Sequence, residues 1–182
     1  MSMSRNDALA ALSDVERAEA RSLDARVYRN SGIQLIGWGV IWMIGYGLEG
    51  LKPYWAPIVW PVLVVAGVVF CFVVVRRSGT RRRTSGWRWA VTGFSVGLFF
   101  WGTYTLFPPT APAPAAAFPA LVLAFAYAVV GGWRFTRFLV IAAALFGLTM
   151  VGVFYLPSVI DFWLAAVGGG ALVLGGAWLM RA

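Results

Sequence analysis

Two carboxylates border long apolar stretches of the sequence, where a charged side chain is energetically unfavourable. Glu49 lies near the end of one stretch, and Asp161 lies at the beginning of another. An ionisable group in apolar surroundings is costly unless it is paired or used, so each is a candidate ion, proton or solute site. For each carboxylate we favour a structural role over a role in binding. Glu49 could be simply exposed, or it could pair with Lys52, which follows it by three residues. Ser158 precedes Asp161 at the spacing of a helix-capping pair.

Three consecutive hydroxyl-bearing residues, Thr103, Tyr104 and Thr105, form a second candidate site. They lie in the segment WGTYTLF, at a depth similar to that of Glu49. Together these residues could line a shallow polar pocket for an ion or a small solute. The simpler interpretation, which we favour, is that the threonines bond to their own helix backbone and that the aromatic residue lies at a membrane interface.

The remaining residue types exclude several classes of chemistry. The sequence has no histidine, so a histidine-ligated haem is excluded, as is the usual general base near neutral pH. Cys71 is the one cysteine and lies within VVFCFVVV, so the chain cannot form a disulfide or a thiolate metal cluster by itself. No nucleophile and base can be paired by their spacing. We therefore expect no enzyme activity, no catalytic residues, no metal site and no cofactor.

Six apolar stretches position these residues. Of the 182 residues, 60% are hydrophobic and 12% are charged, a composition outside that of soluble globular domains. A helix of about 20 apolar residues crosses a bilayer core of about 30 Å. The stretches cover approximately residues 31–50, 55–75, 87–107, 117–134, 137–156 and 160–180. The sequence predicts an all-α integral membrane protein with six transmembrane helices in three successive hairpins, preceded by a cytoplasmic N-terminal helix.

The distribution of basic residues predicts the orientation of these spans. Fourteen of the fifteen basic residues fall on one side of the predicted spans, and Lys52 alone falls on the other. Because cytoplasmic loops carry an excess of arginine and lysine, both termini should be cytoplasmic. The richness in alanine, glycine and arginine favours a bacterial source, and hence a multi-pass protein of the bacterial cytoplasmic (inner) membrane.

A run of arginines, RRSGTRRRTSGWRW, joins the second and third predicted spans. Its flanking spans and its tryptophans favour a topology anchor that contacts anionic lipid headgroups of the bilayer. Nucleic-acid binding would need a folded platform or a longer basic arm, so no nucleic-acid partner is expected. The predicted headgroup contacts are Arg76, Arg77, Arg81, Arg82, Arg83 and Arg88.

Residues 1–28 are predicted to form a cytoplasmic amphipathic helix, and residues 29–182 the six-helix transmembrane domain. The first 28 residues carry five acidic residues among four arginines, so they lack the basic start and apolar core of a cleavable signal peptide. Ser4 and Asp7 have the spacing of a helix start. This helix is either a solvated lead-in to the first span or a docking element for a cytoplasmic or membrane protein.

Prolines and glycines predict the turns and the helix contacts. The segment FPPTAPAPAAAFP should form an extended, stiff loop on the external side. Small residues let membrane helices approach closely, and Gly93, Gly97, Gly168 and Gly175 are the predicted packing positions. They serve either the interior of a single six-helix bundle or the contact surface of a homo-oligomer.

Three classes of function compete on this evidence. The leading one is a non-enzymatic polytopic membrane protein that acts by assembly with itself or with a partner protein. The alternative is a small transporter or channel for an apolar or weakly polar solute. An enzyme acting on lipids comes last, because no catalytic pair of residues is visible.

Overall fold

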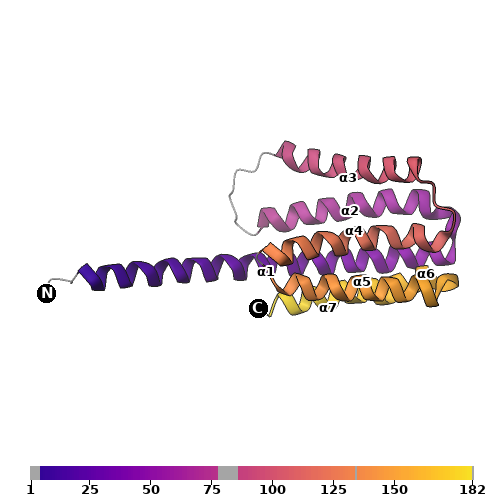
Figure 1. Cartoon of the computed structure of the whole chain (residues 1–182). Helices are drawn as coiled ribbons and strands as arrows, with labels where there is room; N and C mark the ends of the chain where they lie inside the picture. Colours follow the sequence, from indigo (N-terminus) through magenta and orange to yellow (C-terminus); the bar gives the residue numbers. More distant parts are fainter. Residues whose placement is uncertain (1–4, 78–85, 134, 182) are drawn as a thin grey trace.

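The chain folds into a bundle of long helices joined by short turns (Figure 1). The computed structural model describes residues 5–77, 86–133 and 135–181, and these ranges contain no strand. The long helices are α1 (Arg5–Leu51), α2 (Ala56–Arg77), α3 (Gly86–Leu106), α4 (Pro112–Trp133) and α5 (Arg137–Tyr155). The last segment consists of α6 (Ile160–Trp163), a π-helical turn (Leu164–Gly168) and α7 (Gly169–Leu179).

Five helical segments of the described residues are long and apolar enough to cross a membrane. They are Leu12–Leu51, Pro53–Val74, Pro112–Trp133, Arg137–Tyr155 and Pro157–Leu179. The described part of the chain is therefore all-helical, with several helices suited to a bilayer, as the composition predicts. Helix α3 occupies the predicted third span but is not among these five segments, so the six-span topology stays a prediction.

The N-terminal segment and the first span form one continuous helix, not two separate elements. Helix α1 contains 47 residues and is about 70 Å long at 1.5 Å per residue. The sequence has no proline or glycine between residues 5 and 31 to end the helix at the expected boundary near residue 28. Figure 1 shows the first half of α1 extending far beyond the other helices. Residues 5–27 are called the N-terminal arm below.

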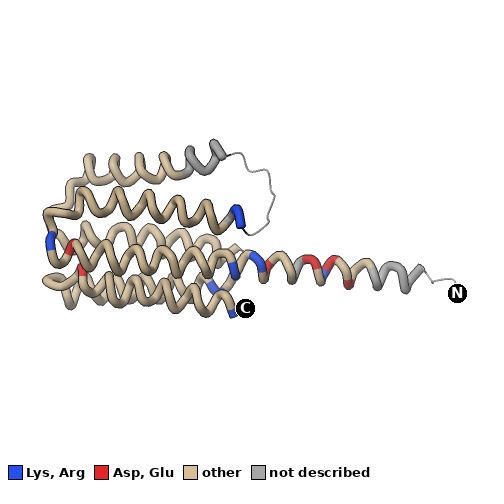
Figure 2. The backbone as a smooth tube through the Cα atoms, turned by 180° about the vertical axis from the view of Figure 1, so that it is seen from behind, with Lys and Arg blue, Asp and Glu red and all other residues tan. Residues whose placement is uncertain are grey.

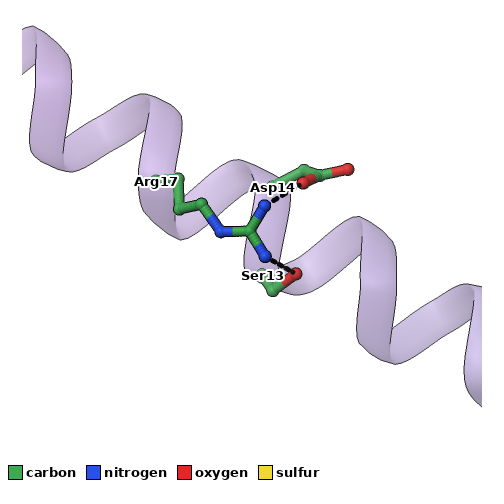
Figure 3. A network of polar contacts seen from close by, with 3 residues as sticks. All are labelled: Ser13, Asp14 and Arg17. Carbon is green, nitrogen blue, oxygen red and sulfur yellow. Dashed lines mark hydrogen bonds and ion pairs between the residues drawn. The ribbon is translucent and has the colours of Figure 1, made fainter.

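The side chains of the N-terminal arm bond to one another along its exposed surface. Arg17 donates a hydrogen bond to Asp14 at 3.0 Å and another to Ser13 at 3.1 Å (Figure 3). Ion pairs as exposed as this one contribute little to stability. The predicted helix start at Ser4 lies outside the described residues.

The helices align so that the bundle has two chemically different ends. We call the end next to the N-terminal arm proximal and the opposite end distal. Figure 2 shows basic residues gathered at the proximal end, whereas the distal end carries a few charges of both signs. The proximal basic residues include Arg76 and Arg77 at the end of α2, Arg137 at the start of α5, and Arg181. This clustering agrees with the charge distribution read from the sequence.

Helix α4 begins within the segment that the sequence predicts to be an extended loop. Its first residue is Pro112 instead of a residue near 117. The reason is that the first turn of a helix has backbone N–H groups without intrahelical partners, so Pro112 and Pro114 sacrifice no hydrogen bond there. Pro119 also lies inside the helix. The turn between α3 and α4 is therefore shorter than predicted.

Four glycines bring α1 and α7 into close antiparallel contact. A β-carbon on Gly39 would lie 2.7 Å from the carbonyl oxygen of Gly169, and one on Gly32 would lie 2.6 Å from that of Gly176. The reciprocal positions on α7 are equally crowded. Each helix has its two glycines seven residues apart, so both lie on one face of that helix. This close approach holds the membrane-spanning part of α1 against α7.

The predicted packing glycines differ in what surrounds them. A β-carbon on Gly168 would lie 3.5 Å from the ring of Trp42, and one on Gly175 would lie 3.2 Å from Ile141. Gly168 therefore lies in an ordinary van der Waals contact, and Gly175 lies in a tighter one. Gly93 and Gly97 of α3 have no neighbouring atom within 4 Å of this position among the described residues. Within the described part of the chain, they therefore make no helix contact.

Candidate functional site

The first candidate residue, Glu49, is held at the distal end by a residue of the next helix. It lies near the C-terminal end of α1 and is half-buried. Its carboxylate accepts a hydrogen bond from the indole nitrogen of Trp60 at 2.8 Å. The short turn Pro53–Trp55 reverses the chain between the two residues. The same indole ring packs edge-on against Tyr46, with 4.8 Å between the ring centroids.

The predicted pairing of Glu49 with Lys52 is wrong. Among the described residues no ion pair joins the two, and the ammonium group of Lys52 lies 4.8 Å from the ring centroid of Trp55. Helix α1 ends at Leu51, and Lys52 has φ −144° and ψ 79°, which are not helical values. The three-residue spacing therefore does not place Lys52 on the helix face that carries Glu49.

The predicted capping of the last span by Ser158 is also wrong. Residues Pro157–Val159 form a 3₁₀ turn, and neither this turn nor α6 begins with a side-chain capping bond. Asp161 lies in the first turn of α6, where the helix dipole favours a negative charge. Its side chain is half-buried.

The fold brings Glu49 and Asp161, which are far apart in the sequence, to one place at the distal end. Asp161 adds a repulsive electrostatic contribution at Glu49, weaker than the effect of burial. A direct contact joins the segments that carry them, since a β-carbon on Gly50 would lie 3.0 Å from the ring of Phe162. Two like charges near each other are unfavourable unless a proton or a cation compensates. Two carboxylates thus lie at the distal end, on segments that touch each other.

Two tyrosines complete the polar surroundings of these carboxylates. Tyr46 donates a hydrogen bond to the carbonyl oxygen of Ala116 at 2.8 Å, and Tyr104 donates one to the carbonyl oxygen of Ala115 at 2.9 Å. Both tyrosines interact electrostatically with Glu49. The early part of α4 thus holds both rings in place. We call Tyr46, Glu49, Trp60, Tyr104 and Asp161 the distal cluster.

The neighbouring threonines do not join the distal cluster through hydrogen bonds. The Thr105 hydroxyl donates a hydrogen bond to the carbonyl oxygen of Trp101 at 2.7 Å, one turn earlier in its own helix, and its side chain is exposed. The sequence pattern favours this backbone bonding of the threonines over a polar pocket. Thr103 is half-buried. Of the three predicted hydroxyls, only that of Tyr104 bonds to another helix within the described residues.

Sequence reasoning missed Tyr46 and Trp60. Tyr46 precedes Glu49 by three residues, so the helical spacing alone places both on one face of α1. This spacing could have identified Tyr46 as a neighbour of Glu49 from the sequence. Trp60 lies on the next helix, and its distance from Glu49 depends on the turn geometry and on the relative rotation of α1 and α2. A single sequence carries no comparable signal for this contact.

The predicted headgroup arginines lie only partly within the described residues. The guanidinium of Arg76 lies 4.4 Å from the ring centroid of Phe72, and Arg77 is exposed beside it. Arg81, Arg82 and Arg83 lie outside the described residues, as does the side chain of Arg88. The described pair is at the proximal end, as headgroup contact requires.

No group of three or more histidine, cysteine, aspartate or glutamate side chains suited to a metal ion occurs among the described residues. Thr149 of α5 has the one buried side-chain oxygen or nitrogen without a hydrogen-bond partner in that part of the chain. Neither observation gives a second candidate polar site, besides the distal cluster, among the described residues.

Replacing Trp60 with phenylalanine is expected to lower the free energy of unfolding by about 1–2 kcal/mol. The change removes the hydrogen bond to a carboxylate but keeps an aromatic ring. Thermal unfolding of the purified protein in detergent measures the effect. Trp55→Phe is the control, because the Trp55 ring is exposed and touches Lys52 instead of Glu49. Equal losses in the two variants would show that the bond to Glu49 contributes nothing.

Comparison with known proteins gives no match: no protein-family model fits the sequence, and no curated protein or solved structure is significantly similar to it.

Proposed function

We propose that this is a non-enzymatic polytopic membrane protein that acts by assembly with itself or with a partner protein. The observation that carries the proposal is the open side of α3. Where glycines of α1 and α7 face each other, they allow two helices to approach closely. Gly93 and Gly97 have the same spacing as a helix-packing motif, yet nothing in the described chain lies against them.

The remaining contacts of α3 support this interpretation. Among the described residues its aromatic packing against other helices is confined to Phe118 of α4. Most of the other large side chains of α3 are exposed, including Phe94 and Trp101. Lipid covers exposed apolar side chains adequately, but close helix packing makes better use of adjacent glycines. A second copy of α3 is the natural occupant, because a pair of identical helices can bring the same two glycines together.

The test replaces Gly93 and Gly97 together with leucine and measures the oligomeric state of the protein in lipid vesicles by single-molecule photobleaching. We expect the wild-type chain to be oligomeric and the variant to dissociate at least about tenfold more readily, which corresponds to about 1.4 kcal/mol. Gly147→Leu is the control, since Gly147 also faces open space but lies on α5, which packs against α4 and α7. An unchanged oligomeric state in the double variant would contradict the role of α3.

The N-terminal arm is the proposed contact for a partner protein. Leu12, Val15 and Leu23 are exposed on the arm, and its charged residues are of both signs. Deletion of residues 1–27 should release a co-purifying partner without changing contacts within the bundle. Retention of that partner would show that it binds elsewhere.

Residence in a bacterial cytoplasmic membrane, with both termini on the cytoplasmic side, is part of this proposal. The proximal location of the basic residues supports it, because basic residues are enriched on the cytoplasmic side. A cysteine placed in the N-terminal arm should react with a membrane-impermeant reagent only after the cells are opened.

A second candidate function, a small transporter or channel, is favoured by the distal cluster. It gathers two carboxylates at one end of the bundle, and the last span contains a π-helical turn at Leu164–Gly168, a feature frequent at functional sites. Solute or cation flux in vesicles should then fall in Glu49→Gln and Asp161→Asn. Equal flux in both variants and the wild type would remove this candidate.

A further inference from the structure

An apolar groove runs along the surface between α5 and α7. Its volume is about 300 Å³. Small side chains leave this space open, and larger apolar ones border it. The lining includes Val140, Ile141 and Ala144 of α5 and Ala171, Leu174 and Trp178 of α7. Figure 1 shows that α5 and α7 are antiparallel. Val140 lies near the start of α5 and Trp178 near the end of α7, so both lie at the proximal end of the groove.

An arginine lies just beyond this proximal end on each side: Arg137 is the first residue of α5, and Arg181 lies two residues past the end of α7. Arg137 precedes Val140 by three residues and is therefore on the same side of α5. Arg181 follows Trp178 by three residues, and its backbone N–H donates a hydrogen bond to the Trp178 carbonyl oxygen at 3.2 Å. The apolar groove thus ends next to two residues that carry a positive charge, Arg137 and Arg181.

Arg137 is held in position before any ligand binds. Its Nη1 donates a hydrogen bond to the Trp178 carbonyl oxygen at 3.1 Å. Its guanidinium lies 4.9 Å from the ring centroid of Trp178 and 5.7 Å from that of Tyr28. A guanidinium has five N–H donors, and this is its one donated bond among the described residues. A fixed guanidinium loses little conformational entropy when it binds an anion.

We propose that this groove binds one anionic phospholipid, with an acyl chain along the apolar lining and the phosphate at Arg137 and Arg181. The charge complementarity decides the occupant: a phosphate matches two guanidinium groups in geometry and sign, and an acyl chain matches the apolar lining. Basic pockets between membrane helices bind such headgroups. The site lies on α5 and α7, away from the glycines of α3, so it is independent of the proposed assembly surface.

Native mass spectrometry of the full chain in detergent tests the site, with titration of phosphatidylglycerol or phosphatidylcholine. We expect one phosphatidylglycerol to bind with preference over phosphatidylcholine. Arg137→Gln should weaken that binding about tenfold, since a charge-assisted bond contributes about 1.5 kcal/mol or more. Arg26→Gln removes the same charge from the N-terminal arm and should leave the binding unchanged.

A second pair of variants tests the groove without changing any charge. Ala144→Phe fills the groove and should also weaken phosphatidylglycerol binding about tenfold. Ala143→Phe adds the same ring at an exposed neighbouring position that does not line the groove, and it should bind as the wild type does. The proposal is overturned if phosphatidylcholine binds equally well, or if Ala144→Phe and Ala143→Phe bind phosphatidylglycerol equally.

Discussion

Replacing Gly39 with alanine is expected to destabilise the bundle by about 1–3 kcal/mol, the usual cost of overpacking a close contact. Helix propensity alone would predict the opposite change in stability, since alanine is a better helix former than glycine. The added methyl group would lie 2.7 Å from the Gly169 carbonyl oxygen and 2.7 Å from a methyl group of Val173. Backbone cannot yield to it as a flexible side chain can, so α1 and α7 must move apart. The midpoint of thermal unfolding in detergent measures the loss.

Gly47→Ala is the matched control for this prediction. Gly47 lies on the same helix, and nothing in the described chain lies within 4 Å of its β-carbon position. Alanine there should be neutral or should stabilise the protein by up to about 1 kcal/mol through helix propensity. The account of the α1–α7 contact fails if the two alanine variants unfold at the same temperature.

Replacing Leu172 with alanine is expected to cost about 3 kcal/mol, within the range measured for buried leucines. Leu172 of α7 has no exposed surface and belongs to the core cluster that includes Trp42, Tyr46, Leu145 and Leu164. In a bilayer, lipid is as apolar as leucine, so the cost arises mainly from lost packing around the cavity. Unfolding midpoints in detergent and in lipid bilayers report it.

Leu174→Ala, two residues further along α7, separates packing from hydrophobicity. Leu174 is 73% exposed, so its truncation should change the free energy of unfolding by less than about 0.5 kcal/mol. A comparable loss at both positions would mean that α7 is covered on both faces, and would contradict the arrangement of helices described here.

The lengths of most helices could be predicted because hydropathy is a local property of the sequence. The predicted span 137–156 corresponds to α5 (Arg137–Tyr155), and the predicted span 55–75 to α2 (Ala56–Arg77). The predicted helix boundaries were wrong where a residue type is compatible with two local structures. Proline disfavours a helix interior but is tolerated in the first turn. The proline-rich segment therefore allowed either a loop or a helix start, and α4 begins at Pro112 within the predicted loop.

The candidate site was only partly predictable, because its contacts join separate helices. The sequence shows that Glu49 and Asp161 border apolar spans, but not that the fold brings them together. The sequence also does not show how each helix is rotated about its own axis, and therefore which face contacts its neighbour. The predicted packing glycines include Gly168 and Gly175, whereas the closest backbone contacts with α1 are made by Gly169 and Gly176. A shift of one residue turns the contact face by about 100°.

The mass of the complex, extracted gently from its native membrane and analysed together with every protein that accompanies it, tests the central claim of assembly most directly. The account predicts either a homo-oligomer that dissociates when Gly93 and Gly97 are both replaced with leucine, or a complex with a second protein. A lone chain of 19.8 kDa, with neither a second copy nor a partner, would contradict it and would leave transport through the distal cluster as the remaining candidate.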